Sequence, residues 1–473
     1  MVIAIELASD KIATVPLSKD SYLLVEPDTA SWAIVDKEVY NVISSGRLET
    51  LPKKMLYMLY SAGLISIEGE TAISPHSFSK YQKPDPVLGV IKASTRCNLK
   101  CKYCYAYRGE DVGDIMDLET ARKCVDFMMR SKEKRIRIVL HGGEPLYVGK
   151  NWLFEFLKYV SKVEKKFAKK VEVGIQTNGT LISKELATLL AKYKVGVGVS
   201  IDGPPEINDE VRPFNDGSPS TQIVTKAIKL LISLGVEVGV IAVITKLNFN
   251  RMGEVLSFFQ SLGISDIKLL PCSAVMGRSR YHPEIHISPK EYFMAMKSAI
   301  EFCLNNDSKL VIKPISYLVE NIISWERRFM CSRSPCGAAN NILTFDINGD
   351  IYPCDEIVGF KEYVIGNVWS NTMKEVLYHP TSIDFRNRIV SKIEKCSKCI
   401  WRNFCGGGCA TRALLKTGRL LAEDEFCEYY KLIIPYLIKL IYNKKEFALK
   451  KLLPYFELEF KDFPINKSNL HTT

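Results

Sequence analysis

Three cysteines lie close together near residue 100, at the spacing Cys-x3-Cys-x2-Cys. They are Cys97, Cys101 and Cys104, and they directly follow an apolar, β-type run at residues 87–93. A structural zinc site normally uses four protein ligands, and a four-iron cluster also offers four metal positions. Three thiolates would leave one iron open for a ligand that is not protein. A tight loop with buried thiols and a zinc knuckle are the alternatives.

Composition limits the classes of protein that this chain can be. With 473 residues, 47% of them hydrophobic, we expect two or three domains with real cores. The chain has no uncharged apolar run of about 18 residues and no signal peptide, so we expect a cytoplasmic protein without a membrane segment. In that compartment the 14 cysteines are better candidates for metal or cluster ligands than for disulfides. The net charge of +11 is dispersed among acids, so nucleic acid is not an expected partner.

The three cysteines must be held by the elements around them, and the region that begins at residue 87 alternates strand and helix. Strands are predicted at residues 87–94, 135–141, 171–177, 195–201, 236–245 and 266–271, with helices near residues 117–130, 151–169, 182–193, 221–234 and 251–262. Six such repeats predict a parallel sheet curled towards a barrel, with the chemistry in loops at the carboxyl ends of the strands. The cysteine loop follows the first of these strands.

Polar and glycine residues follow the next three strands. Gly142, Gly143 and Glu144 come after the second strand, Thr177 and Asn178 after the third, and Ser200 after the fourth, with Arg212 further on. They would suit a small ligand with an amine and a carboxylate on the open iron. The glycines would permit close approach, Glu144 would accept from the ammonium group, and Ser200 and Arg212 would hold the carboxylate. Taken alone, a Gly-Gly pair is usually a turn and a loop arginine is usually a surface ion pair.

The cysteine loop and the Gly-Gly-Glu-Pro motif at residues 142–145 together resemble the radical SAM superfamily over about residues 87–271. In that family, three cysteines bind a four-iron cluster, and the amine and carboxylate of S-adenosylmethionine chelate the fourth iron. The resemblance implies that an electron from the cluster splits the sulfonium and gives a 5′-deoxyadenosyl radical, which abstracts hydrogen from an unactivated C–H bond. Thr177 and Asn178 would then face the ribose or the methionine chain, and Tyr103 would lie near the purine.

A second group of eight cysteines lies towards the C-terminus. The seven from Cys336 onward, together with Gly349, resemble the SPASM extension of peptide- and protein-modifying members of the superfamily. The resemblance implies two auxiliary four-iron clusters, one on Cys331, Cys336, Cys354 and Cys409 and the other on Cys396, Cys399, Cys405 and Cys427. Two zinc sites are the alternative. Cys331 lies outside the seven-cysteine core, and without it the first auxiliary cluster would itself have an open iron.

Asp355 directly follows Cys354. A carboxylate beside a ligand thiolate could take the proton released when a substrate radical is oxidised, and the resemblance to sulfatase-maturating relatives implies this role for Asp355. An ordinary surface acid in a turn is the alternative. The other cysteines, Cys124, Cys272 and Cys303, have no partner spacing and are interpreted as core thiols.

The two ends of the chain are predicted to be additional modules. Residues 1–70 read as strands followed by helices, an order that resembles a small winged-helix module and the domains that capture a leader peptide as an added strand. A packing or dimerisation module is the alternative. Residues 71–86 read as a linker, 87–310 as the partial barrel, 311–430 as the cysteine-rich domain and 431–473 as a helical extension.

These patterns combine into one hypothesis. The chain should be an α/β protein with a partial (β/α)6 TIM-like radical SAM barrel, an N-terminal winged-helix-like module and a C-terminal SPASM domain. We expect an enzyme that modifies a side chain of a ribosomally made precursor peptide, with S-adenosylmethionine and three four-iron clusters as cofactors and a reductant such as ferredoxin or flavodoxin as partner. The alternatives are a sulfatase maturase that forms formylglycine and a non-catalytic zinc- or cluster-binding scaffold.

Overall fold

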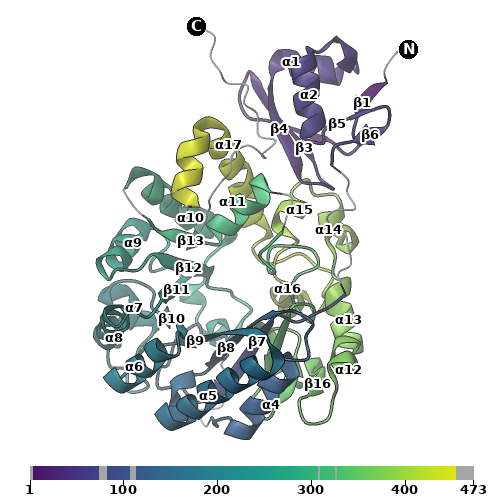
Figure 1. The fold of residues 1–473 in the computed structure, drawn as a ribbon. Helices are drawn as coiled ribbons and strands as arrows, with labels where there is room; N and C mark the ends of the chain where they lie inside the picture. Colours follow the sequence, from purple (N-terminus) through teal and green to yellow (C-terminus); the bar gives the residue numbers. More distant parts are fainter. Residues whose placement is uncertain (1–3, 74–82, 107–112, 307–308, 325–326, 454–473) are drawn as a thin grey trace.

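The computed structural model describes residues 4–73, 83–106, 113–306, 309–324 and 327–453. Figure 1 shows an N-terminal module, a curved sheet with helices on its outer face, and a C-terminal region that faces the open side of the sheet. The predicted α/β class is therefore confirmed, and the sheet does not close into a barrel. Part of the predicted linker, residues 74–82, lies outside the described residues.

The N-terminal module consists of two small antiparallel sheets and two helices. One sheet contains β2 (Ala13–Pro16), β3 (Ser21–Glu26) and β4 (Ser31–Asp36), and the other contains β1 (Ile5–Leu7), β5 (Ile65–Ile67) and β6 (Glu70–Thr71). The helices are α1 (Lys37–Ser44) and α2 (Lys53–Ser61). Asp36 caps α1, because its side chain accepts the backbone N–H of Val39 at 2.8 Å. Leu24, Leu59 and Ile65 belong to a small core of the module's own.

The central sheet contains ten strands in the order β13-β12-β11-β10-β9-β8-β7-β14-β15-β16. Its six consecutive parallel strands are β7 (Leu88–Ser94), β8 (Arg135–Gly142), β9 (Lys170–Thr177), β10 (Gly196–Ser200), β11 (Val238–Ile244) and β12 (Asp266–Pro271). Along β8, buried Ile136, Ile138 and Leu140 alternate with the more exposed Arg137 and Val139. This alternation is expected for a strand whose one face is covered by helices and whose other face points towards the more open, concave side of the sheet.

Helices cover the outer, convex face of this sheet (Figure 1). They are α4 (Leu118–Met128), α5 (Gly149–Phe167), α6 (Lys184–Lys192), α7 (Pro205–Val211), α8 (Thr221–Ser233) and α9 (Met252–Ser261). The strands and helices predicted for this region all lie within two residues of these bounds, and α7 is the helix that the sequence analysis did not identify. The sequence therefore determines this part of the fold largely through local hydrophobic periodicity.

Strands from beyond the six repeats extend the sheet at both edges. β13 (Val311–Lys313) pairs in parallel with β12, and β14 (Ile342–Phe345) pairs in parallel with β7. The strands β15 (Asp350–Tyr352) and β16 (Gly366–Asn367) then continue from β14 in antiparallel fashion. The C-terminal region thus shares one sheet with the repeats, and the predicted boundary between residues 310 and 311 precedes four strands of that common sheet.

The C-terminal region consists mainly of short helices and one long helix. The short ones are α12 (Met373–Leu377), α13 (Pro380–Asn387), α14 (Glu394–Ser397), α15 (Arg402–Cys405) and α16 (Ala410–Thr417). The long helix α17 (Cys427–Leu452) packs on α10 (Pro289–Asn305) and α11 (Ile315–Ile323), with the rings of Tyr429 and Tyr292 4.5 Å apart. No helix in the described ranges is long and apolar enough to cross a membrane. Residues 454–473 of the predicted extension lie outside the described residues.

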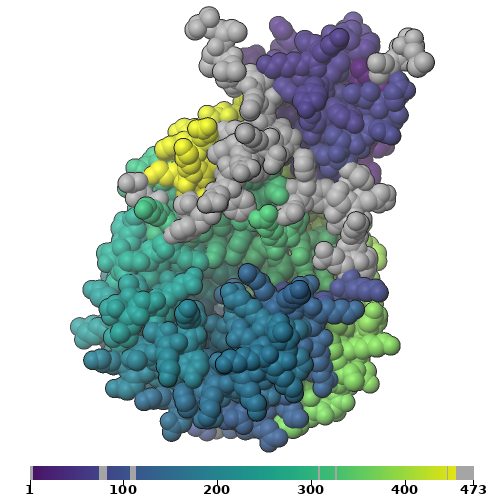
Figure 2. Space-filling view, in the orientation of Figure 1, coloured from purple at the N-terminus to yellow at the C-terminus, as the bar shows by residue number. Residues whose placement is uncertain are grey.

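The N-terminal module rests on the rest of the protein through β4 and the turn that precedes it. The indole N–H of Trp32 donates to the carbonyl of Ile322 in α11 at 2.9 Å. In α15, Asn403 donates to the carbonyl of Asp28 at 2.9 Å, and the guanidinium of Arg402 pairs with the Asp28 carboxylate. Figure 2 shows the module (purple) as a separate lobe at the top of the molecule. Leu23, Val25 and Ile34 also belong to the main hydrophobic core, so the module is attached by apolar packing as well as by these polar contacts near α11 and α15.

Candidate functional site

The first cysteine set, defined as Cys97, Cys101 and Cys104, lies in the loop after β7. Part of the loop pairs with the chain that follows α7, because the backbone N–H of Lys100 donates to the carbonyl of Pro213 at 2.9 Å. All three cysteine residues are partly exposed. Burial, with a smaller contribution from the charge of Cys104, raises the pKa of Cys97 to about 11 and that of Cys101 to about 12. Thiols this close would ionise only with a positive group among them, which a metal cluster provides.

Gly142 and Gly143 bring the end of β8 against the chain that enters this loop. A Cβ at Gly142, where φ is +137°, would lie 2.0 Å from the carbonyl oxygen of Ser94, and one at Gly143 would lie 2.4 Å from that of Arg96. The N–H of Gly143 donates to the Ser94 carbonyl at 2.7 Å. Only glycine fits at these two positions, because the end of β8 lies directly against the backbone of Ser94 and Arg96. The sequence analysis did not consider this contact between two backbone segments. The predicted approach of a ligand stays a prediction.

Glu144 is fully buried and connects the second loop to the third. Its carboxylate accepts from the hydroxyl of Thr177 at 2.7 Å, from the N–H of Asn178 at 2.7 Å and from the N–H of Leu146 at 3.0 Å. Burial raises the pKa of Glu144 to about 7, and the three hydrogen bonds oppose this increase. Asn178 also donates to the side chain of Asn98, next to Cys97, at 2.9 Å. The second and third loops thus converge on the first cysteine set.

Asp202 forms a buried polar group with Arg212 and Tyr103. The Nε–H of Arg212 donates to Asp202 at 3.1 Å, and the hydroxyl of Tyr103 donates to the same carboxylate. Another Arg212 nitrogen lies 3.8 Å from the sulfur of Cys101. Arg212 therefore reaches the cysteine loop while its charge is balanced by Asp202. The sequence analysis predicted Tyr103 and Arg212 but omitted Asp202, although an acid just before Gly203, in the loop after β10, was a usable signal.

Ser200, the last residue of β10, contacts the neighbouring strand β9. Its hydroxyl accepts from the side-chain amide of Gln176, near the end of β9, at 2.9 Å. Ser200 and Gln176 are both partly exposed, as expected for side chains that point away from the covering helices. The predicted role of Ser200 in holding a carboxylate together with Arg212 stays a prediction.

Asp355 belongs to a second polar group on the same face of the sheet. The ammonium of Lys92 lies 2.6 Å from one Asp355 oxygen, and the hydroxyl of Tyr105 donates to the other. Lys92 also donates to the Tyr105 hydroxyl at 3.0 Å, and His141 Nδ1 accepts the N–H of Gly142 at 2.8 Å. Burial raises the pKa of Asp355, but Lys92 and His141 together hold it well below its ordinary value. Burial lowers the pKa of His141 to about 4.

Lys92 and Tyr105 were not among the predicted site residues. The signal for Lys92 was its position as the charged residue in an otherwise uncharged strand, Leu88–Ser94, where a buried lysine requires a partner. That partner comes from a residue more than 250 positions away, so the sequence could not identify it. The ion pair joins β7 to the C-terminal region next to Cys354.

The second cysteine set, defined as Cys331, Cys336, Cys354 and Cys409, gathers beside this polar group. Burial raises the pKa of Cys354 well above its ordinary value, and the charges of Glu356, Cys409 and Cys331 raise it further. The thiol of Cys409 donates to Glu356 at 3.4 Å. Cys331 is exposed, whereas Cys336, Cys354 and Cys409 are partly buried. The structure thus places Cys331 within electrostatic reach of Cys354.

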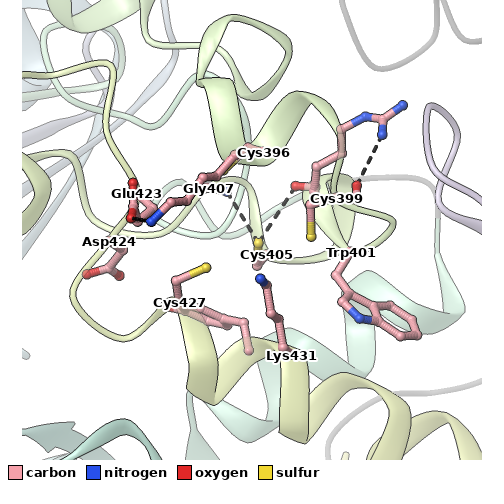
Figure 3. A pocket seen from close by; sticks show the side chains of 12 residues that line it. Cys396, Cys399, Trp401, Cys405, Gly407, Glu423, Asp424, Cys427 and Lys431 are labelled. Carbon is pink, nitrogen blue, oxygen red and sulfur yellow. Dashed lines mark hydrogen bonds and ion pairs between the residues drawn. The ribbon is translucent and has the colours of Figure 1, made fainter.

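The third cysteine set, defined as Cys396, Cys399, Cys405 and Cys427, lines one pocket between α14, α15 and α17. Figure 3 shows the sulfur atoms of Cys399, Cys405 and Cys427 turned towards this pocket. Arg388, which is almost fully buried, fixes the chain around the pocket, because its guanidinium donates to the carbonyls of Gly407 at 2.8 Å and Ala422 at 3.0 Å. The four thiols come from segments up to 31 residues apart in the sequence, yet they share one site.

The arrangement of the thiols bears on the kind of metal group that they fit. Among the residues that the structure describes, no three His, Cys, Asp or Glu side chains converge closely enough to hold one metal ion. Thiols grouped as in the three cysteine sets are the donors that iron–sulfur clusters use. Cys124, Cys272 and Cys303 are buried in the main core, apart from these sets.

Two family models match the chain. Residues 91–259 match the radical SAM superfamily, and residues 336–400 match SPASM, an iron–sulfur cluster-binding domain. The first match begins within β7 and ends within α9, so it covers the strands and loops that hold the first cysteine set. The second includes Cys336, Cys354, Cys396 and Cys399.

Among curated relatives, a cysteine-type anaerobic sulfatase-maturating enzyme of Clostridium perfringens is 26% identical over 376 residues, which cover 76% of this chain and 98% of the relative. The radical SAM cyclopropyl synthase TigE of Paramaledivibacter caminithermalis is 22% identical over 472 residues, which cover 92% of this chain and 96% of the relative. The match to the synthase therefore includes more of this chain than the match to the maturase does.

Among solved structures, native anSMEcpe with bound AdoMet and Cp18Cys peptide matches with a TM-score of 0.66 at 27% identity, and the match covers 76% of this chain and all of that chain. Streptococcus suis SuiB bound to precursor peptide SuiA matches with a TM-score of 0.58 at 18% identity, and the match covers 90% of this chain and all of that chain. The second likeness concerns the fold alone.

Proposed function

The chain belongs to the radical SAM superfamily and carries a SPASM domain, and on this basis we propose that it is a maturase of ribosomally made peptides. The protein is an enzyme, so the non-catalytic scaffold is set aside. The observation that favours a precursor peptide is the N-terminal module, which rests on the C-terminal region through β4 and the turn before it. The extended match to a cyclopropyl synthase, over 92% of this chain, supports the same choice.

The first cysteine set would hold the four-iron cluster at which S-adenosylmethionine binds. When bound, the cluster supplies the electron that splits the sulfonium and so provides the radical that abstracts hydrogen. The chain's part is to hold and orient these groups. Arg212, with its charge balanced by Asp202, is available at the cysteine loop to bind a carboxylate. The backbone around Gly143 and the buried Glu144 keep the loop in one conformation.

The second and third cysteine sets would hold the two auxiliary clusters. Their donors are all thiols that can ionise, which is the chemistry that iron–sulfur clusters require. The second set lies beside Asp355, at the more open face of the sheet. The third lies beside the region that contacts the N-terminal module. Arg402, which lies between Cys399 and Cys405 in the sequence, pairs with Asp28 of that module. We propose ferredoxin or flavodoxin as the reductant.

Asp355 is our candidate for the group that takes a proton from the substrate. Lys92 holds the carboxylate ionised, and the Tyr105 hydroxyl orients it. An ionised carboxylate can accept a proton when a neighbouring substrate radical is oxidised. Because its pKa is lowered, Asp355 can take a proton only from a strongly acidic group. A substrate carbon radical that loses an electron becomes a cation, and the protons next to that cation are strongly acidic.

The N-terminal module would capture the leader of the peptide. In the sheet of β2, β3 and β4, both outer strands have an edge to which no other described strand pairs. An extended peptide can bind such an edge through backbone hydrogen bonds. Deletion of residues 1–85 is expected to weaken peptide binding and to leave cleavage of S-adenosylmethionine without substrate intact. Unchanged binding would exclude the recognition role.

The second candidate is an anaerobic sulfatase maturase. Its support is the match to the Clostridium perfringens enzyme, which includes 98% of that relative. The test compares two substrates with the reconstituted full chain under anaerobic conditions. One is a short Cys- or Thr-rich precursor peptide, chosen from the reading frames that neighbour this gene, and the other is a sulfatase-derived peptide with its target cysteine or serine. 5′-Deoxyadenosine formation coupled to a mass change in the first peptide supports our proposal, and coupling to the second supports the sulfatase maturase.

A further inference from the structure

The pocket of the third cysteine set contains positive charge as well as thiols. Three cationic side chains line it, Lys395, Arg402 and Lys431. Lys431 lies one helical turn after Cys427 on α17, so both residues are on the same side of the helix. Figure 3 shows the Lys431 side chain extending from α17 towards the sulfur of Cys405, between those of Cys427 and Cys399. Its ammonium group is thus directed into the space that the thiols surround.

Two of these three cations have an acidic partner. Lys395 pairs with Glu423, and Arg402 pairs with Asp28 of the N-terminal module. The remaining acid in the wall, Asp424, is engaged by Arg412 at 2.6 Å. For Lys431, no ion pair or hydrogen bond occurs within the described ranges.

A cluster held by four thiolates carries negative charge, and reduction adds one more unit. A nearby cation favours the reduced form, and because Lys431 is itself exposed, solvent screens part of this effect. We propose that Lys431 is a positioning residue for electron transfer that raises the reduction potential of the cluster in the third cysteine set. This inference rests on the proposed function, because it requires that the set holds an iron–sulfur cluster.

Lys431 also occupies the side of the pocket that faces outward. Together with Lys395, Glu423 and Cys427 it lines a more open cleft, which extends to Glu428 and His286. The same side chain therefore borders both the thiols and the solvent from which an electron carrier would approach. A cation at this boundary is placed to act on the cluster without being a ligand.

The test is a redox titration followed by electron paramagnetic resonance on the reconstituted full chain. The background carries alanine at Cys97, Cys101 and Cys104, so that the signals of the second and third sets remain. Lys431→Gln is expected to move one of these signals to a more negative potential. We expect about a tenfold decrease in the ratio of reduced to oxidised cluster at a fixed potential, which corresponds to about 59 mV for one electron.

The matched control is the double variant Lys395→Gln with Glu423→Gln, which removes an ion pair of the same wall without changing its net charge and is expected to leave both potentials unchanged. Lys431→Arg keeps the charge and is expected to keep the original potential. Unchanged potentials in Lys431→Gln, or an equal shift in the double variant, would overturn the proposal. If Lys431→Gln takes up too little iron, Lys431→Arg decides, and a negative shift there counts against it. A protein that binds zinc and gives no signals refutes the proposed function instead.

Discussion

The first and third cysteine sets hold their thiols by different means. The first lies in a loop that is fixed by other loops of one parallel sheet, through backbone contacts at Gly143 and the buried residues Glu144 and Asp202. The third lies among short helices, where Arg388 fixes the chain and Lys431 adds charge. The first set has three thiols and the buried ion pair of Asp202 and Arg212 beside it, and the third has four thiols and a cation, Lys431, with no ion pair among the residues that the structure describes. We infer that the first is built to admit a ligand and the third to tune a closed cluster.

Removal of the first cysteine set should have the largest effect on activity, and it distinguishes the role of this set from that of the third set. Replacement of Cys97, Cys101 and Cys104 by alanine should abolish 5′-deoxyadenosine formation, because no cluster would remain to bind S-adenosylmethionine. Bound iron should fall from about twelve to about eight atoms per chain, since the other sets keep theirs. Iron analysis and chromatography of the reaction products measure both. Surviving reductive cleavage would show that the first set is assigned wrongly.

The next effect concerns the buried ion pair beside the first set. Asp202→Asn leaves the Arg212 guanidinium buried without a counter-charge, and we expect a loss of about 3 kcal/mol in the free energy of unfolding. The matched control is Arg251→Gln, which removes an exposed ion pair with Glu254 and should cost less than about 1 kcal/mol. Denaturant titration of both variants gives the comparison. If the two variants lose the same free energy of unfolding, the ion pair of Asp202 and Arg212 contributes no more than an exposed ion pair does.

A smaller effect tests the close backbone approach at the first set. Gly143→Ala places a Cβ 2.4 Å from the Arg96 carbonyl oxygen, so we expect about 2 kcal/mol of destabilisation and weaker retention of iron by the first set. Gly253→Ala in α9 is the control, because no atom lies within 4 Å of its added Cβ and alanine favours a helix. If both variants unfold at the same denaturant concentration as the original protein, the glycine argument is wrong.

The smallest effect lies at the third set, where the N-terminal module is attached. Asp28→Asn removes the counter-charge of the buried Arg402, and because Asp28 itself is partly exposed, solvent offsets part of the loss, so we expect about 1.5 kcal/mol. Limited proteolysis should then separate the module from the rest of the chain more readily. Asp20→Asn, at an exposed position of the same module, should leave the rate of cleavage unchanged. Equal rates of proteolytic cleavage for the two variants would show that the Asp28–Arg402 ion pair does not help to hold the module in place.

The sequence predicted the elements that depend on local pattern and missed those that depend on distant contacts. Hydrophobic periodicity located β7 to β12 within two residues, and cysteine spacing identified the residues that form three separate groups. It could not reveal that Lys92 pairs with Asp355 or that β14 joins β7, because each contact links residues more than 250 positions apart. It also could not give the spatial reason for Gly142, since the clash involves Ser94 in another strand.

The pairing of β14 with β7 has a consequence for how this protein can be divided. A chain ending at residue 310 would keep every strand of the six repeats and the loop that carries the first cysteine set. It would nevertheless leave one edge of β7 without its partner strand β14. Strand β7 is almost entirely buried in the full protein, and an exposed apolar edge readily recruits other chains. We therefore expect such a fragment to aggregate. The six repeats and the cysteine-rich region share one sheet, so we expect that they must be expressed together.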